Sequence, residues 1–193
     1  ITSTPATTNL IHLPISGYAR LELGVAVVLA DIAPVGPDYL PGHAHADTLS
    51  FEMSLYQRRV IVNSGTSVYG LSAERHRQRG TRAHSTLCLF NENSSEVWEG
   101  FRVGRRARVS RVSAEQGSET LKLAAQHDGY CHLDGHPKHR RTWCLENSNL
   151  TIHDDIIGAG FQLCDIRFHL APEVRAEACT QGDVLLSDSR GHH

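Results

Sequence analysis

PGHAHADTLSFEMSLYQRRVIVN, residues 41 to 63, combines a Pro-Gly turn, two histidines and a segment of alternating apolar and polar residues. The histidines, His43 and His45, are separated by one residue. Because alternate side chains of a strand share a face, we expect both imidazoles to project to the same side. Two imidazoles in that arrangement suit a metal ion, or a metal on one ring and a substrate oxygen on the other.

The alternation after the histidines predicts a strand with one buried face. Leu49, Phe51, Met53 and Leu55 occupy one parity, and residues 59–62 (RVIV) follow as a hairpin partner. Upstream, residues 18–23 and 25–33 form a second predicted hairpin. Further strand-like segments lie at residues 85–90, 97–112, 120–126, 139–145, 150–157, 161–170, 174–178 and 184–186. Turn signals recur about every 8 to 12 residues, which favours an all-β, antiparallel β-sandwich.

Two segments do not fit this strand pattern. Residues 64–83 are rich in Gly, Ser and Arg without apolar periodicity, so we expect a long functional loop. Residues 1–16 are rich in Thr, Ser and Pro, so we expect a linker or the end of a preceding region, with the sandwich domain over residues 17–193.

Composition limits the classes of function. The chain has 193 residues, is 40% hydrophobic and 21% charged, and carries a formal net charge of −2, which is ordinary for one globular domain and predicts no general attraction to nucleic acid or membrane. Neither a membrane span nor a signal peptide is visible. The first residue is not Met and the only methionine is Met53, so we expect a fragment. Five cysteines without a CxxC pair predict buried free thiols.

A candidate metal site combines the two closely spaced histidines with a later one, His84. Catalytic zinc sites commonly use three protein ligands drawn from His and carboxylate. The third ligand could be Asn63 or Asp47, and Asp47 could instead accept the second ring N–H of a ligand histidine. The alternative is that these are surface histidines at the entry to a strand.

Other side chains near this motif are candidates for contact with a substrate. Glu52 lies on the polar face of the predicted strand, where a solvated carboxylate is the alternative. Tyr69, in a Gly-bounded loop, could serve as a general acid or base, or could anchor the loop.

Arginines are dense for a chain of slightly negative charge. Guanidinium groups pair with carboxylate and sulfate, so such a cluster suits an acidic polysaccharide. Ion pairing with Glu74, Glu96 and Glu99 is the alternative. The cluster comprises Arg75, Arg77, Arg79, Arg82, Arg102, Arg105 and Arg106.

Several separated motifs together resemble the C-terminal β-sandwich domain of heparinase II/III-like polysaccharide lyases. In order they are HAHADTLSFE, VNSGTSVYG, ERHRQRGTRAHST, SSEVWEGFRVGRRA, HDGY and RRTW, within roughly residues 17 to 172. The resemblance implies a supersandwich-like fold, incomplete at its C-terminal end, preceded in the full chain by an (α/α) toroid that is its partner across a substrate cleft. It also implies a bacterial lyase that cleaves a uronate-containing polysaccharide, such as a glycosaminoglycan or alginate, by β-elimination.

The same resemblance implies roles for individual residues. His43 matches the histidine that faces the substrate carboxylate, and Tyr69 matches a tyrosine near the cleft. His45 and His84 match ligands of a structural Zn²⁺, and Asn63 stands where the family typically has an aspartate ligand. Substrate contacts are expected from Glu52 and from the arginine list above, Arg79, Arg82 and Arg102 in particular.

Two other classes of protein remain open, as does the compartment. A cupin-type metal oxygenase also carries HxH followed by Glu, although Glu52 comes later than the cupin outline requires. A non-catalytic carbohydrate-binding or structural sandwich is the second alternative, favoured by Asn63 in place of an acidic ligand. The resemblance implies export to the periplasm or medium.

Overall fold

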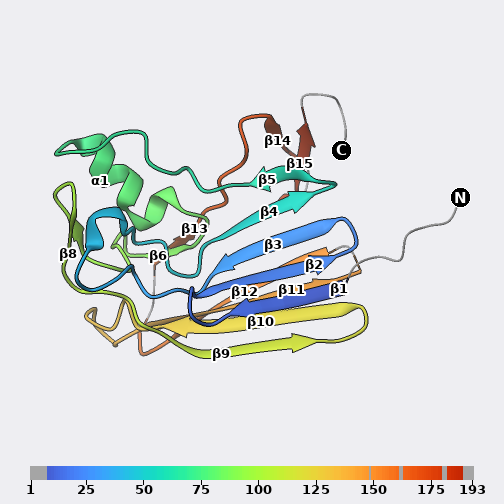
Figure 1. Cartoon of the computed structure of the whole chain (residues 1–193), viewed down its shortest axis with the longest axis horizontal. Coiled ribbons are helices and arrows are strands. Elements are labelled where there is room, and N and C mark those ends of the chain that lie inside the picture. Colours follow the sequence, from blue (N-terminus) through green and yellow to red (C-terminus); the bar gives the residue numbers. More distant parts are fainter. Residues whose placement is uncertain (1–7, 148, 161–162, 180–181, 189–193) are drawn as a thin grey trace, which may run out of the picture.

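Two antiparallel sheets form the body of the protein (Figure 1). The computed structural model describes residues 8–147, 149–160, 163–179 and 182–188. The first sheet is a meander in the order β1-β2-β3-β4-β5, and the second has the order β12-β11-β10-β9. Their bounds are β1 Thr8–Leu13, β2 Tyr18–Leu23, β3 Ala26–Asp31, β4 Phe51–Leu55 and β5 Arg58–Ile61, then β9 Val109–Gln116, β10 Thr120–His127, β11 Lys138–Glu146 and β12 Asn149–Ile157.

Three short strand pairs and the helical turns complete the described part of the chain. The pairs are β6 Leu87–Leu89 with β13 Cys164–Ile166, β7 Val97–Trp98 with β8 Arg102–Val103, and β14 Val174–Ala178 with β15 Val184–Asp188. One α-helix, α1, spans Ala73–Arg79, and two 3-10 turns, η1 and η2, span Pro41–His43 and Thr81–Ala83. No helix among the described residues is long and apolar enough to cross a lipid bilayer.

The core lies between the two large sheets because alternate residues of their strands face inward. On β2 and β3 these are Ala19, Leu21, Ala26, Val28 and Ala30. On the facing sheet, Leu121 pairs with Leu145 and Leu123 with Trp143 across β10 and β11. The expected antiparallel β-sandwich is therefore confirmed.

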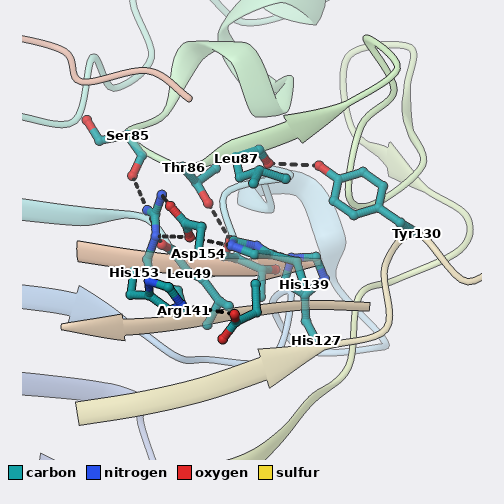
Figure 2. Close-up of polar contacts among 12 residues, drawn as sticks. Leu49, Ser85, Thr86, Leu87, His127, Tyr130, His139, Arg141, His153 and Asp154 are labelled. Carbon is teal, nitrogen blue, oxygen red and sulfur yellow. Dashed lines mark hydrogen bonds and ion pairs between the residues drawn. The ribbon is translucent and has the colours of Figure 1, made fainter. Parts of the chain in front are cut away.

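Farther along β10 and β11 the same inward face becomes polar (Figure 2). His127 is paired with His139 across the two strands, and Arg141 follows on the same face, all three with no exposed surface. Asp154 of β12 accepts from Arg141 through both carboxylate oxygens, at 2.7 and 2.9 Å. Burying a charge is costly unless it is paired and hydrogen-bonded, and this bidentate contact provides both.

The hydrogen bonds of this polar row define the protonation of both histidines. The Gly129 amide donates to Nδ1 of His127 at 3.0 Å, so the His127 proton lies on Nε2 and is donated to Nδ1 of His139 at 3.2 Å. Nε2–H of His139 then donates to Asp154 at 2.6 Å. Burial is the main reason that the pKa of each imidazole lies below its usual value, and both rings are neutral.

Acid should therefore destabilise the protein through His127. A folded-state pKa below the unfolded one means that its contribution to stability is complete above pH 6.5 and is lost as pH falls. Between pH 7 and pH 5 the wild type should lose about 2 kcal/mol more than a His127→Asn variant. Denaturant unfolding at both pH values measures this difference. The matched control is His153→Asn, whose histidine side chain is 70% exposed; an equal pH effect in both variants would contradict the assignment.

Four expectations need correction. Strand β1 occupies Thr8–Leu13, where we expected a linker, because Leu10 packs on the core beside β2; residues 1–7 lie outside the described residues. Helix α1 lies inside the expected 64–83 loop. His43 ends a 3-10 turn and β4 begins only at Phe51, so the two histidines are not on a strand. All five thiols are free, but Cys88 alone is fully buried, Cys131 and Cys144 are half-buried, and Cys164 and Cys179 are exposed.

Candidate functional site

The candidate site lies at the end of the sandwich that carries α1, η1 and the short strands β6 and β8 (Figure 1). Ser72 begins α1, because its hydroxyl accepts from the Arg75 amide at 3.0 Å, and Gly80 follows its end. The face of α1 toward the protein consists of Arg75, Gln78 and Arg79, spaced i, i+3, i+4. Polar residues on the buried face explain why apolar periodicity did not reveal this helix.

Arg75 and Arg79 are buried and bind carbonyl and hydroxyl oxygens. Arg75 donates to Gly100 O, Gly42 O and Thr66 Oγ1 at 3.1, 2.9 and 2.8 Å. Arg79 donates to Ala44 O, Glu99 O and Arg102 O at 3.0, 3.2 and 3.1 Å. In the part of the chain that the structure describes, neither guanidinium has an ion pair with a carboxylate. Among the described residues, these two positive charges therefore lie close together without an acidic partner. Burial is the larger cause, and the charge of Arg75 the smaller one, that lowers the pKa of Arg79.

The buried position of Arg79 corrects one expectation. Its side chain is 0% exposed and its N–H groups point to backbone carbonyls, so it cannot touch a polysaccharide directly. Instead it ties η1 and the β7–β8 turn to α1. Its charge acts on the site through space.

His45, Asp47 and His84 form a cluster in which one ligand atom of each residue lies within 4.8 Å of the others. Nδ1 of His45 is 3.3 Å from Nε2 of His84, although the two residues are 39 positions apart in the chain. Nε2 of His45 contacts Thr66 Oγ1 at 3.1 Å, and Thr66 is in turn held by Arg75. The predicted approach of His45 and His84 is thus present in the structure.

The donor set of this cluster fits a divalent transition metal. Burial lowers the pKa of both imidazoles to about 4, and for His45 the nearby His84 is the second cause. Both rings are therefore neutral and can offer a lone pair. Burial raises the pKa of the Asp47 carboxyl, and a bound cation would offset that penalty. Nδ1 of His84 is buried and has no hydrogen-bond partner among the residues that the structure describes. Two imidazoles and one carboxylate are a common zinc donor set.

His43 and Tyr69, the expected catalytic residues, lie together beside this cluster. Their rings meet edge to face with centroids 6.0 Å apart. Tyr69 is 63% exposed, His43 is exposed too, and the Arg75 guanidinium lies 5.3 Å from the Tyr69 ring centroid. Both side chains are open to a ligand.

The remaining expected site residues have different surroundings. Asn63 Oδ1 accepts from the Gly65 amide at 2.9 Å. Glu52 forms an ion pair with Arg59 at 2.7 Å and is not in the His45 cluster. Arg82 contacts Asp165 at 3.5 Å and remains exposed. Arg102 stacks 5.0 Å from the Trp98 ring centroid, with 65% of its side chain exposed. The ligand roles of these residues stay predictions.

A pair of variants distinguishes the two candidates for the third metal ligand. Because Asp47 lies in the cluster, Asp47→Asn should weaken zinc binding by at least about tenfold. Because the Asn63 Oδ1 already accepts from the Gly65 amide, Asn63→Ala should change zinc binding less than about twofold. Competition titration with a zinc-sensitive dye measures both affinities. The opposite order, or tighter binding by Asn63→Asp, would assign the ligand to Asn63.

Taken together, the fold and the cluster define a β-sandwich of the class that carries a histidine-rich site at one end of its sheets. The chain matches the family model described as heparinase II/III-like, C-terminal, over residues 5–193, and it belongs to that family. Membership in this family excludes the alternative that the chain is a cupin-type metal oxygenase. The search of curated proteins found no match.

Solved structures of similar fold come from the same group of proteins. A mutant of the heparan sulfate lyase HepC from Pedobacter heparinus superposes with a TM-score of 0.69 and 21% identity, covering 91% of this chain and 26% of that one. A structure of heparinase III gives 0.68 and 21%, covering 88% and 26%. The chain thus spans about a quarter of the length of these proteins. At 21% identity, the likeness to them shows a shared fold and nothing more.

Proposed function

We propose that this chain is the sandwich domain of a polysaccharide lyase that cleaves a uronate-containing acidic polysaccharide by β-elimination. The observation that carries the proposal is the pair of buried arginines, Arg75 and Arg79, held behind His43 and Tyr69 with no carboxylate partner within residues 8–147, 149–160, 163–179 and 182–188. Buried charge is costly unless it is balanced. An anionic substrate at the exposed His43 and Tyr69 supplies the balancing charge.

The reaction makes specific demands on such a site. A base removes the C5 proton of the uronate, the C4–O bond breaks, a C4=C5 double bond forms, and the leaving oxygen takes a proton. The negative charge that develops beside the uronate carboxylate needs positioned cations and donors. In the proposal His43 faces that carboxylate, Tyr69 serves at the proton-transfer step, and the two arginines stabilise the charge from behind. Residues of a preceding toroid, implied by the resemblance, complete the site.

We also propose that the His45 cluster holds a structural Zn²⁺. His45, Asp47 and His84 would bind it, and the ion would join the segment after η1 to the segment after η2. In that role the ion would hold in place the segment after η1, next to His43. Export to the periplasm or medium remains a prediction of the resemblance.

The test of the lyase proposal is product formation by the full-length protein. Heparan sulfate, chondroitin sulfate and alginate are offered separately, and the double bond of an unsaturated uronate is followed by ultraviolet absorbance. An unsaturated product from any of them supports the proposal. Binding of one glycan without any unsaturated product would instead favour the non-catalytic carbohydrate-binding alternative.

Salt should weaken binding of the acidic glycan. The exposed cations Arg82 and Arg102 are screened by solvent ions, because the Debye length falls from about 10 Å at 0.1 M to about 3 Å at 1 M. We expect affinity to fall on the order of tenfold over this range, and less in an Arg102→Gln variant. Calorimetric titration at four salt concentrations measures the slope. Affinity that does not depend on salt would contradict a role for these arginines.

A further inference from the structure

We infer that Arg141 is a positioning residue for the site: its guanidinium, oriented by Asp154, joins the two segments that carry the candidate metal ligands. This inference rests on the proposed metal site, but its first test does not require metal. Arg141 lies on β11 in the middle of the core face, and it touches neither the candidate ligands nor the exposed His43 and Tyr69 through any contact found among the described residues.

One nitrogen of Arg141 makes the junction (Figure 2). Nη1 donates to Leu49 O at 2.9 Å and to Ser85 O at 2.8 Å. Leu49 is two residues after Asp47, and Ser85 directly follows His84. The segments to which these carbonyls belong are 92 and 56 positions away from Arg141 in sequence. A single fully buried cation therefore bridges the two segments.

The segment after Asp47 needs such a restraint. Leu49 has φ of 62°, a left-handed conformation that a branched side chain rarely adopts, and the Ser50 amide closes the turn on Asp47 O at 2.8 Å. Strained backbone persists only where its surroundings hold it. The Arg141 bond to the Leu49 carbonyl is one such contact, and the hydroxyl of Thr86 adds another by donating to Thr48 O at 3.2 Å.

The Asp154 carboxylate and the histidines behind it orient the guanidinium. Asp154 is contacted by Nε and Nη2 of Arg141, which leaves Nη1 directed at the two carbonyls. His139 donates to the same carboxylate at 2.6 Å. Lysine has one nitrogen in place of this planar fork, so it cannot bind the carboxylate through two atoms and reach both carbonyls as well.

The first experiment measures amide hydrogen exchange in the full-length protein with zinc removed by a chelator. Arg141→Lys should speed exchange by about tenfold or more in residues 44–50 and 81–86 together. The matched control is Leu145→Ala, which removes a fully buried side chain from the same face of β11. It should loosen the sheets without singling out these segments. Unchanged exchange in either segment, or the same pattern in both variants, would overturn the inference.

The second measurement is zinc affinity of the same folded variants. We expect Arg141→Lys to bind zinc at least about tenfold more weakly than Leu145→Ala, as loss of a positioning partner does in metal sites. If the wild type binds no zinc, the metal proposal fails while the exchange data still decide the role of Arg141. If Arg141→Lys does not fold, Asp154→Asn keeps the guanidinium but removes the charge that orients it. Exchange in both segments should then rise, and protection equal to wild type would overturn the inference.

Discussion

Replacing His45 with alanine should remove zinc from the protein. His45 supplies one of the three donors found in the cluster among the described His, Cys, Asp and Glu residues. Two remaining ligands hold a dication weakly, so affinity should fall by at least about 100-fold. Elemental analysis of the purified full-length protein should find about one zinc per chain in the wild type and none in the variant.

His43→Ala is the matched control, because it lies two residues away and outside the cluster. It should retain its zinc. Equal metal content in wild type and His45→Ala would contradict the site, whereas loss in both variants would mean that the turn around η1, rather than the ligand, had been disrupted.

The same His43→Ala variant should lose lyase activity. In the proposed reaction His43 faces the substrate carboxylate as charge develops, and removal of such a group costs about 100-fold or more in kcat. Tyr69→Phe keeps the ring contact with His43 and removes only the hydroxyl. Because that hydroxyl serves at the proposed proton-transfer step, this variant should also lose activity by about 100-fold. Initial rates of double-bond formation measure both effects.

A control for these activity losses is His76→Ala on the exposed face of α1. It should keep wild-type rates. Activity of His43→Ala and Tyr69→Phe near that of the wild type would remove both residues from the proposed site, while leaving the metal cluster untouched.

These predictions bear on how the site is held together. Arg75 contacts Thr66, which contacts His45, and Arg141 contacts the residues that follow Asp47 and His84. Each candidate ligand segment is therefore fixed by a buried guanidinium from another element. A site at the end of a sandwich, where the loops have no sheet of their own, needs restraints of this kind.

Local patterns in the sequence were sufficient for the strands of the two large sheets. Alternation in residues 18–23 and 139–145 places Leu21 and Trp143 inward, because the period of a strand is two whatever the fold around it. The spacing of His43 and His45 likewise indicated the segment that carries two members of the His45 cluster. Linear motifs from residue 43 to residue 143 were enough to indicate the family, which the match over residues 5–193 confirms.

Tertiary contacts decided what those patterns could not. Helix α1 was missed because its buried face is Arg75, Gln78 and Arg79, whose burial becomes possible only when carbonyls from η1 and the β7–β8 turn surround the guanidinium groups. The carbonyls that bury Arg79 come from distant segments, so its sequence surroundings alone predicted a surface cation that could contact substrate.

The sequence by itself determined the strand faces, the all-β class and the histidines worth testing, since these depend on spacing along one segment. Only the tertiary structure decided that Asp47 joins His45 and His84, and that Arg141 unites the segments carrying them. The physical reason is that these contacts connect groups tens of residues apart, and their geometry is set by how two sheets pack and by which buried charges they must pair.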